Sequence, residues 1–259
     1  MKKTIALISV LCMVCMSSFA QDKQVFNHMS LGPTIGLEGI GVDLAMPIGN
    51  SFQVRAGYGI DPIPFNFKVN LGTVSAGGKS VDLNNLPISA NNWKTGTGHI
   101  LFDYYPSKRS GFHISAGVYL NNGKFVTAAA DLSNVLNKSD WGTLAIDLSN
   151  NGKYVSTDTK GQLNIDVKHW NAMPYLGVGF GRAIDPKNVF RFVFDMGLLV
   201  WGSPKVQSYD YTGSKGPQTV VVTADDLKSK SKTAADLIQL ANDIPVCPYI
   251  RFCFYFRLF

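Results

Sequence analysis

Hydrophobic and polar residues alternate along several stretches of this 259-residue chain, most clearly at its end. Side chains alternate between the two faces of a β-strand, so this last stretch predicts a strand with one wholly apolar face. Such a face favours aggregation in water, but it suits a strand whose outer side contacts lipid and whose inner side lines a closed barrel. The apolar face comprises Ile250, Phe252, Phe254, Phe256 and Leu258, and the other face Tyr249, Arg251, Cys253, Tyr255 and Arg257.

Alternation also predicts five earlier strands, over residues 52–61, 99–104, 112–121, 169–180 and 190–200. The region 25–48 decides the total, because its apolar residues fall on odd positions up to Leu37 and on even positions from Ile40. A change of parity of this kind marks a turn or a bulge. Gly39 favours a turn there, since glycine readily adopts a positive φ. The split gives eight strands, and bacterial transmembrane barrels have even strand numbers.

The sequence therefore predicts an all-β fold, an up-and-down antiparallel transmembrane β-barrel of eight strands. Short periplasmic turns are expected near 46–50, 106–111 and 185–188, and long extracellular loops at about 61–93, 124–168 and 202–246. This asymmetry is the rule for such barrels. Two loops carry local signals. Thr223-Ala-Asp-Asp226 predicts the start of a helix that runs to about Asn242, and 149–152 predicts a hairpin turn.

The first twenty residues predict a signal peptide, with a basic start, an apolar core and a small-x-small cleavage site at Ser18-Phe19-Ala20. We therefore divide the chain into a signal peptide, 1–20, and a barrel domain with its loops, 21–259. Export of this kind, together with the predicted barrel, indicates the outer membrane of a Gram-negative cell. No later segment offers the about 20 continuous apolar residues of a membrane helix.

Composition narrows the class of protein further. Only 16% of the residues are charged, against about 25% in a typical soluble domain. The net charge of +6 is modest, and the sequence holds no basic run or motif that indicates nucleic-acid binding. Cys247 and Cys253 lie six residues apart on one predicted strand. That spacing is about 20 Å at roughly 3.3 Å per residue, too far for a disulfide, so we interpret both as small lumen-facing residues.

Charged residues and histidines fall on the predicted lumen side in near balance. Side chains just fill an eight-stranded barrel, and an unpaired charge there would be costly. We therefore predict a structural network of paired charges; a narrow gated pore formed by rearranging these pairs is the alternative. The network is predicted to contain Asp43, Arg55, His99, Asp103, His113, Arg191, Asp195, Arg251 and Arg257.

The spacings of His113 with Ser115 and of His99 with Asp103 place each pair on one strand face, as fragments of a catalytic set would require. The sequence shows no nucleophile motif, metal-ligand cluster or phosphate loop beside them. Histidines that pair within the lumen are the better interpretation. We therefore assign no catalytic residue, no metal site, no cofactor and no particular binding residue.

Signal peptide, alternation, short inner turns, long outer loops and the terminal Phe259 together resemble the small eight-stranded outer-membrane barrels of the OmpA, OmpX and OmpW type. The resemblance covers the whole mature chain. It implies that Phe259 belongs to an assembly signal that the barrel assembly machinery reads, although Phe259 shares the parity of Arg257 and not that of the apolar face. It also implies outer-membrane lipid and lipopolysaccharide as surroundings.

Three functions remain open at this point. The first is a non-enzymatic role in surface binding or structure through the long extracellular loops, since long loops on a rigid scaffold commonly carry function. The second is a narrow pore, or OmpW-like transport of small or hydrophobic solutes. The third is a lipid-modifying enzyme. The sequence does not identify an extracellular ligand.

Overall fold

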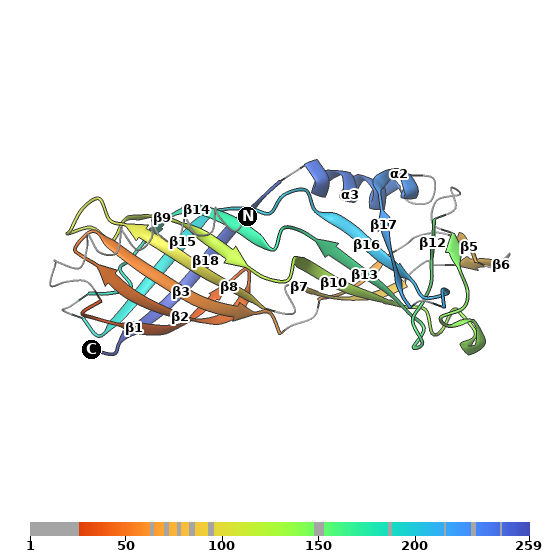
Figure 1. Ribbon diagram of the computed structural model, residues 1–259, viewed down its shortest axis with the longest axis horizontal. Helices are drawn as coiled ribbons and strands as arrows, with labels where there is room; N and C mark the ends of the chain where they lie inside the picture. Colours follow the sequence, from red (N-terminus) through yellow and green to blue (C-terminus); the bar gives the residue numbers. More distant parts are fainter. Residues whose placement is uncertain are drawn as a thin grey trace.

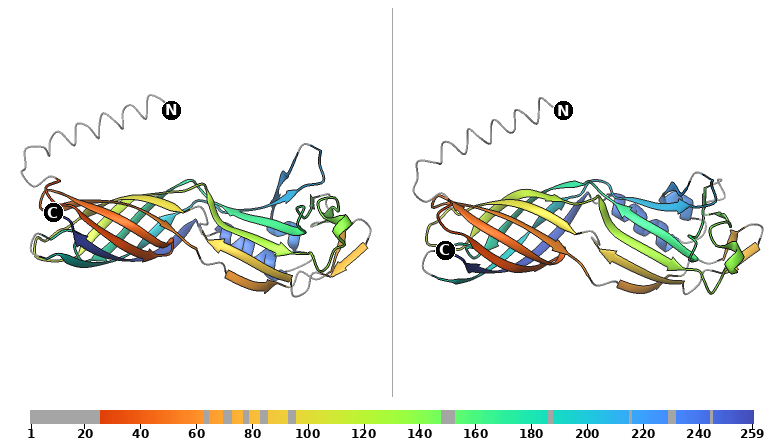
Figure 2. Two further views of the ribbon diagram at one scale, coloured as in Figure 1. Left: turned by 90° about the horizontal axis from the view of Figure 1, so that it is seen from below. Right: turned by 60° about the horizontal axis from the view of Figure 1, so that its bottom comes forward.

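The computed structural model describes residues 26–62, 65–69, 73–76, 79–82, 86–92, 96–147, 153–185, 188–214, 216–228, 232–243 and 245–259. The predicted signal peptide and the hairpin turn at 149–152 lie outside these residues. The molecule is elongated, with a closed barrel at one end and a β-rich extension at the other (Figures 1 and 2). The chain ends at the barrel end that is remote from the extension.

Eight antiparallel strands close the barrel, which confirms the predicted fold class and strand number. Each strand pairs with two neighbours, and the last strand pairs with the first. In order around the wall they are β1 (Ser30–Gly36), β18 (Val246–Arg257), β15 (Phe190–Val200), β14 (Ala172–Phe180), β9 (His113–Leu120), β8 (Thr97–Tyr104), β3 (Phe52–Ile60) and β2 (Gly39–Ile48).

The turn predicted from the change of parity joins β1 to β2. Gly36 pairs with Gly39 across it, and Leu37 and Glu38 form the turn. Gly39 has a φ of +88°, in the left-handed region where glycine is favoured. A Cβ at this position would lie 2.3 Å from the carbonyl oxygen of Ile60 on the neighbouring strand. Both the backbone angle and the close approach of β3 therefore require glycine here.

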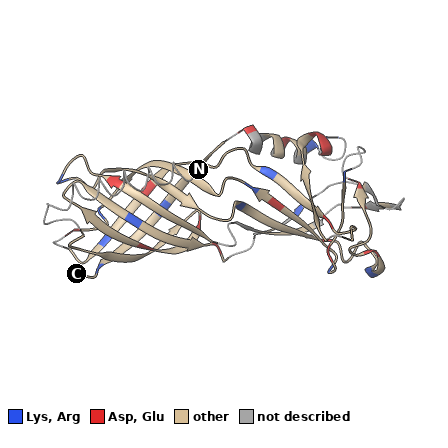
Figure 3. Cartoon of the chain, viewed as in Figure 1, with Lys and Arg blue, Asp and Glu red and all other residues tan. Residues whose placement is uncertain are grey.

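Apolar side chains cover the outside of the barrel. Strand β18 alternates buried and exposed residues along its length, with Phe252, Phe254 and Phe256 outward. The same exposure recurs around the wall, where Leu176 on β14 reaches 63%. Charged residues are sparse on the barrel strands (Figure 3). A closed sheet with an apolar exterior meets the requirement for spanning a bilayer with strands, and the barrel is therefore placed in the outer membrane.

Phenylalanines on β15 and β18 form a ladder on this exterior. Phe190, Phe192 and Phe194 lie beside Phe252, Phe254 and Phe256, with ring centroids 5.2–6.4 Å apart. Aromatic pairs across neighbouring strands stabilise a sheet by about 0.2–1 kcal/mol each. The ladder therefore reinforces the pairing next to the seam between the two ends of the chain.

The wall of the barrel continues into a six-stranded sheet beyond the membrane. Five of its strands directly follow or precede a barrel strand in the sequence, and they keep the barrel's lateral order. Figure 1 shows this continuity. From one edge to the other they are β17 (Gln218–Val222), β16 (Lys205–Asp210), β13 (Gln162–Lys168), β10 (Lys124–Asp131), β7 (Leu86–Asn92) and β4 (Phe65–Val69). We call this sheet and everything beyond it the extension.

A smaller sheet lies at the far tip, with the order β12 (Tyr154–Val155), β11 (Ile146–Asp147), β5 (Thr73–Ala76) and β6 (Lys79–Asp82), and a 3-10 helix, η1, spans Lys138–Asp140. The helix predicted from Thr223 is confirmed as two helices, α2 (Ala224–Leu227) and α3 (Lys232–Asp243). The N–H and hydroxyl groups of Thr223 both donate to the Asp226 carboxylate, as in a capping box. No helix in the described ranges is long and apolar enough to cross a bilayer.

The extension has a hydrophobic core of its own. One face of the six-stranded sheet supplies buried residues of β7, β10 and β13, and residues from 132–147 and 153–155 cover them. The members are Ile88, Ala90, Ala128, Ala130, Leu132, Leu136, Ile146, Val155 and Leu163. The long connections thus contain packed β-structure, and the extension forms an ordered body with its own core next to the barrel.

The turn at Gly39 yields a first prediction. Gly39→Ala should destabilise the folded barrel by about 1–2 kcal/mol, because alanine is disfavoured at positive φ and its Cβ would press on β3. Gly98→Ala is the matched control, since a Cβ at Gly98 would have no neighbour nearer than 3.8 Å. Urea titration measures the stability of both variants. The folded fraction is read from SDS gels, on which the closed barrel of a cold sample migrates differently from the unfolded chain of a boiled one. Equal midpoints for the two variants would contradict the role of Gly39.

Candidate functional site

The inward-facing charges of the barrel meet in one cluster at mid-height, which we call the lumen network. Its members come from six strands: β2, β3, β8, β9, β15 and β18. Each member is at least 97% buried. The network consists of Asp43, Arg55, His99, Asp103, His113, Ser115, Asp195 and Arg251.

Arg55 joins two aspartates across the lumen. Its Nε lies 2.7 Å from Asp103 Oδ2, and its Nη1 lies 2.6 Å from Asp195 Oδ2. Nη2 also donates to Asp103, Asp195 and the Ser115 hydroxyl. Ser115 in turn donates to Asp103 at 2.6 Å. The planar fork of a guanidinium suits this double role, which a lysine could not fill in the same geometry.

Asp195 connects the two arginines of the network. Besides Arg55, it accepts from Arg251 Nη2 at 3.4 Å, and His113 Nε2 lies 2.9 Å from its Oδ1. Arg251 reaches the opposite side, where its Nη1 lies 3.2 Å from Asp43 Oδ2 and 2.5 Å from His99 Nε2. Tyr255 completes that side by donating to Asp43 at 2.8 Å. The two guanidinium groups and three carboxylates therefore form one connected system.

Glycines on the neighbouring strands make room for these side chains. A Cβ at Gly57 would lie 2.1 Å from Asp43 Oδ1, and a Cβ at Gly179 would lie 2.4 Å from His113 Nε2. In the sequence these glycines have lumen parity on predicted strands. They fix where the large polar groups can lie, because any side chain at either position would displace them.

Apolar and aromatic layers separate the network from both ends of the barrel. Towards the extension, the rings of Tyr119, Tyr175 and Tyr249 pack together with centroids 4.9–5.8 Å apart, beside Leu101 and Leu199. Towards the end remote from the extension, a second cluster comprises Ala45, Ala183, Ile184, Val193, Cys253 and Tyr255. Unpaired charges in such surroundings are costly, which explains why the members pair with one another.

Two predicted members, Arg191 and Arg257, lie outside the lumen network. Arg191 is the second residue of β15 and pairs with Asp185 in the turn before that strand, where its side chain is partly exposed. It is four residues, or about 13 Å, from the level of Asp195. Arg257 is the last residue of β18 and is also partly exposed. Parity identified the face of these residues correctly but did not give their height in the barrel.

Glu38 lies in the turn that the change of parity predicts, and it is not among the residues predicted for the lumen. Its side chain is fully buried at the end of the barrel next to the extension. A Cβ at Gly36 would lie 2.6 Å from Glu38 Oε2, and one at Gly59 would lie 2.4 Å from its Cγ. Glycines on two nearby strands, Gly36 and Gly59, were the signal in the sequence that a side chain folds inward there.

Both free cysteines face inward. Cys247 lies in the apolar layer towards the extension, and Cys253 lies in the apolar layer at the opposite end. They belong to different hydrophobic clusters and do not pair with each other. The described ranges contain no group of three or more His, Cys, Asp or Glu residues placed to hold a metal ion.

The extension presents a second polar region, on the face of its sheet opposite the hydrophobic core. Asp166 accepts hydrogen bonds from Lys124, at 2.7 Å, and from the Tyr209 hydroxyl. Burial alone would raise the pKa of Asp166, but the hydrogen bonds from Lys124, Tyr209 and Thr127 outweigh it and hold the pKa below its usual value. Further towards the tip, a hollow of ≈ 420 Å³ on this face is lined by Asn66, Lys68, Pro87, Ile88, Ser89, Ala129, Asp131 and Gln162.

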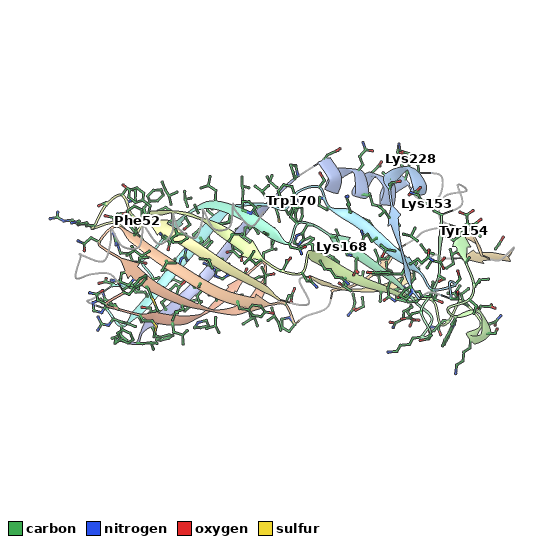
Figure 4. The ribbon with its side chains drawn as sticks, in the orientation of Figure 1. Phe52, Lys153, Tyr154, Lys168, Trp170 and Lys228 are labelled. Carbon is green, nitrogen blue, oxygen red and sulfur yellow. The ribbon has the colours of Figure 1, made fainter. Side chains whose placement is uncertain are left out.

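The junction between barrel and extension carries two tryptophans, Trp170 and Trp201. Trp170 is 55% exposed in the connection between β13 and β14, two residues after Lys168 at the end of β13 (Figure 4). Trp201 packs against Phe125, with ring centroids 4.8 Å apart. Amphipathic rings of this kind favour the boundary between lipid and water, so we place that boundary near these residues. Lys153, Tyr154 and Lys228 lie far beyond it, on the extension.

No family model and no curated protein matches this chain. Among solved structures it is similar to CarO2 from Acinetobacter baumannii, with 15% identity over 91% of this chain and 100% of that one and a TM-score of 0.48. It is also similar to CarO from the same organism, at 15% over 88% and 96% with a TM-score of 0.45. A major outer membrane protein from Thermus thermophilus follows, at 13% over 89% and 99% with a TM-score of 0.38. The assignment as a barrel rests on the strand pairing described above and not on these scores.

The lumen network yields a second prediction. Arg55→Met should destabilise the barrel by about 3–5 kcal/mol, because it leaves Asp103 and Asp195 buried without their main partner. Tyr255→Phe, which removes one hydrogen bond of the same network, should cost only about 1 kcal/mol. Urea unfolding of the barrel in lipid vesicles, followed by tryptophan fluorescence, measures both. A loss for Arg55→Met no larger than that for Tyr255→Phe would show that the pairing contributes little.

Proposed function

We propose that the protein is a non-enzymatic, non-conducting outer-membrane anchor that presents its extension to bind a ligand outside the cell. The observation that carries this proposal is the continuity of the strands. Barrel strands β3, β8, β9, β14 and β15 each lead within a few residues into a strand of the extension sheet. A surface held by five such connections is positioned rigidly against the membrane, which favours a binding role.

The interior of the barrel supports the non-conducting part of the proposal. The lumen network fills the middle, and the two apolar layers lie above and below it. Eight-stranded barrels have an interior that side chains just fill. Conduction would require the arginines to leave their aspartates within a dry environment, which is energetically unfavourable.

The same packing supports a non-enzymatic role. The Ser115 hydroxyl donates a hydrogen bond to Asp103. His113 pairs with Asp195, and His99 pairs with Asp43. All of these groups are buried, so a substrate could reach them only after the layers had opened. These contacts favour a structural role for the two pairs that the sequence offered as catalytic fragments.

The exterior supports two partners. The apolar belt and the tryptophans at its outer edge fit outer-membrane lipid and lipopolysaccharide. The last strand, with its outward phenylalanines, fits recognition by the barrel assembly machinery. Phe259 itself is 61% exposed, and its backbone carbonyl accepts a hydrogen bond from the Met29 N–H at 3.4 Å. An exposed aromatic side chain next to the seam of the barrel is accessible to an assembly factor.

The plugged lumen predicts an absence of ion conduction. The wild-type protein, reconstituted in a planar bilayer, should show no discrete current steps in concentrated KCl, a condition chosen to reveal even narrow pores. A porin of known conductance in the same bilayer is the positive control. Discrete steps in the wild type whose size changes in Asp195→Ala would establish a pore through the network and overturn this part of the proposal.

The extension predicts a loss of binding when it is removed. A trimmed barrel, with residues 62–95, 122–170 and 202–245 replaced by short Gly-Ser linkers, should fold but lose binding to surface ligands. Arrays of glycans and host matrix proteins, probed with both forms, would measure this. Cold and boiled SDS gels report whether the trimmed barrel is closed.

The matched control keeps the extension and changes the other end of the barrel. A variant with residues 106–111 replaced by a Gly-Ser turn should bind the array like the wild type. If the trimmed barrel bound the array as strongly as the wild type, the extension would not be the binding element.

A further inference from the structure

A pocket of ≈ 490 Å³ opens at the periplasmic mouth of the barrel, away from the extension. Three short connections surround it: the turn after β2, the turn after β8 and the segment after β14. The chain just before β1 forms a further wall. Its lining residues are Asn27, His28, Pro47, Gly49, Asn50, Gln53, Lys108, Arg109, Arg182, Ile184 and Asp185.

The lining is strongly positive. It holds Lys108, Arg109 and Arg182 against a single carboxylate, that of Asp185. Asp185 already pairs with Arg191 and accepts a hydrogen bond from the Asn188 side chain. Lys108 and Arg109 are exposed, and neither side chain makes an ion pair within the described part of the chain. This mouth thus carries cations that no carboxylate among the described residues pairs with, in contrast to the lumen.

Arg182 fixes the shape of the pocket. Its guanidinium lies over the Tyr105 ring, 4.2 Å from the centroid, in a cation–π contact. It also donates to the carbonyl oxygens of Ser107 and Ser110, at 2.7 and 3.2 Å. These two bonds bracket Lys108 and Arg109. The turn that carries the two free cations is therefore held in place across the mouth rather than left to move.

The floor of the pocket is polar and closed. Gln53 donates from Nε2 to the Ile184 carbonyl at 3.1 Å and accepts at Oε1 from the Tyr105 hydroxyl, also at 3.1 Å. Below it lie the inner apolar layer and the lumen network. A ligand that enters this pocket would therefore be bound at the mouth and would not pass through.

We propose that this pocket binds the phosphate group of an anionic ligand, with Lys108, Arg109 and Arg182 as its cationic partners. Guanidinium and ammonium groups that converge from neighbouring connections recognise phosphate through charge-assisted hydrogen bonds. The amide groups of Asn27 and Asn50 and the ring of His28 supply neutral partners in the same wall. The site lies on the side of the membrane opposite the extension, so it is independent of surface binding.

A phosphate group could reach this mouth from two sources. One is the headgroup of an anionic phospholipid in the inner leaflet, because lipid-facing rings flank the pocket: Phe52 and Tyr104, close to Asn50, pack with centroids 5.0 Å apart. The other is a soluble phosphate compound of the periplasm. The volume exceeds what inorganic phosphate alone would fill, so the pocket has room for the group that carries the phosphate.

The test uses the full-length mature barrel in a neutral detergent. Short-chain phosphatidylglycerol and glycerol 3-phosphate are titrated separately by calorimetry, and short-chain diacylglycerol serves as the lipid without phosphate. We expect saturable binding of at least one phosphate compound and none of diacylglycerol. In Lys108→Gln/Arg109→Gln the affinity should fall by on the order of tenfold or more, since two charged partners are lost.

The control removes the same charge from the other end of the molecule, where Lys138 and Lys160 are exposed on the extension. Lys138→Gln/Lys160→Gln should bind like the wild type. Binding of the phospholipid alone identifies a headgroup site, and binding of glycerol 3-phosphate identifies a soluble source. The proposal would be overturned if neither phosphate compound bound, or if the control variant lost as much affinity. It would also be overturned if Lys108→Gln/Arg109→Gln showed a normal gel shift and unchanged affinity.

Discussion

The pairing of the first strand with the last is the constraint on which the rest of the structure depends. Strands β1 and β18 join over the register from Ser30 with Arg257 to Gly36 with Arg251. In a bilayer each unsatisfied N–H or C=O group would cost several kcal/mol, so an open edge is not tolerated. The approach is close, since a Cβ at Gly32 would lie 1.9 Å from the Phe254 carbonyl oxygen. Once this seam closes, the outward faces must be apolar and the inward charges must find partners among themselves.

The protein uses its cations in two opposite ways as a result. Arg55 and Arg251, enclosed by the wall, each reach more than one aspartate, and the two apolar layers keep water from substituting for those partners. Lys108 and Arg109, only one turn outside the wall, face an open mouth. The first arrangement gives rigidity, and the second leaves charge available for recognition. Residue type alone does not distinguish the paired cations from the exposed ones. The height of each residue along the barrel axis does.

That distinction also marks what the sequence could predict. A period of two gave the faces of β3, β9 and β18 without reference to any other strand, because each strand carries its own lipid-facing residues. The change of parity before Gly39 gave the eighth strand. Height was not available from the pattern, so Arg191 and Arg257 were grouped with Arg251. Glu38 was missed because the direction of its side chain depends on glycines of other strands, a non-local condition.

The extension was harder to predict for a related reason. Its strand β10 contains Ala128, Ala129 and Ala130 in a row, which shows no alternation, and pairs with β7 and β13 from other parts of the chain. The apolar face of the sheet forms only when these three segments meet. The helix from Thr223 was predictable because its cap is local. Elements that carry their own signal were found from the sequence, and elements that depend on distant partners required the structure.

Strand continuity between barrel and extension has a mechanical consequence. A tether attached to the extension would pull along β9–β10, β14–β13 and β15–β16, nearly parallel to the strands. Such a load shears many backbone hydrogen bonds at once, whereas a load across a sheet edge opens them one after another. Tension would thus pass into the wall of the barrel without a flexible linker to yield first. A cell held through this protein would be held by the whole barrel.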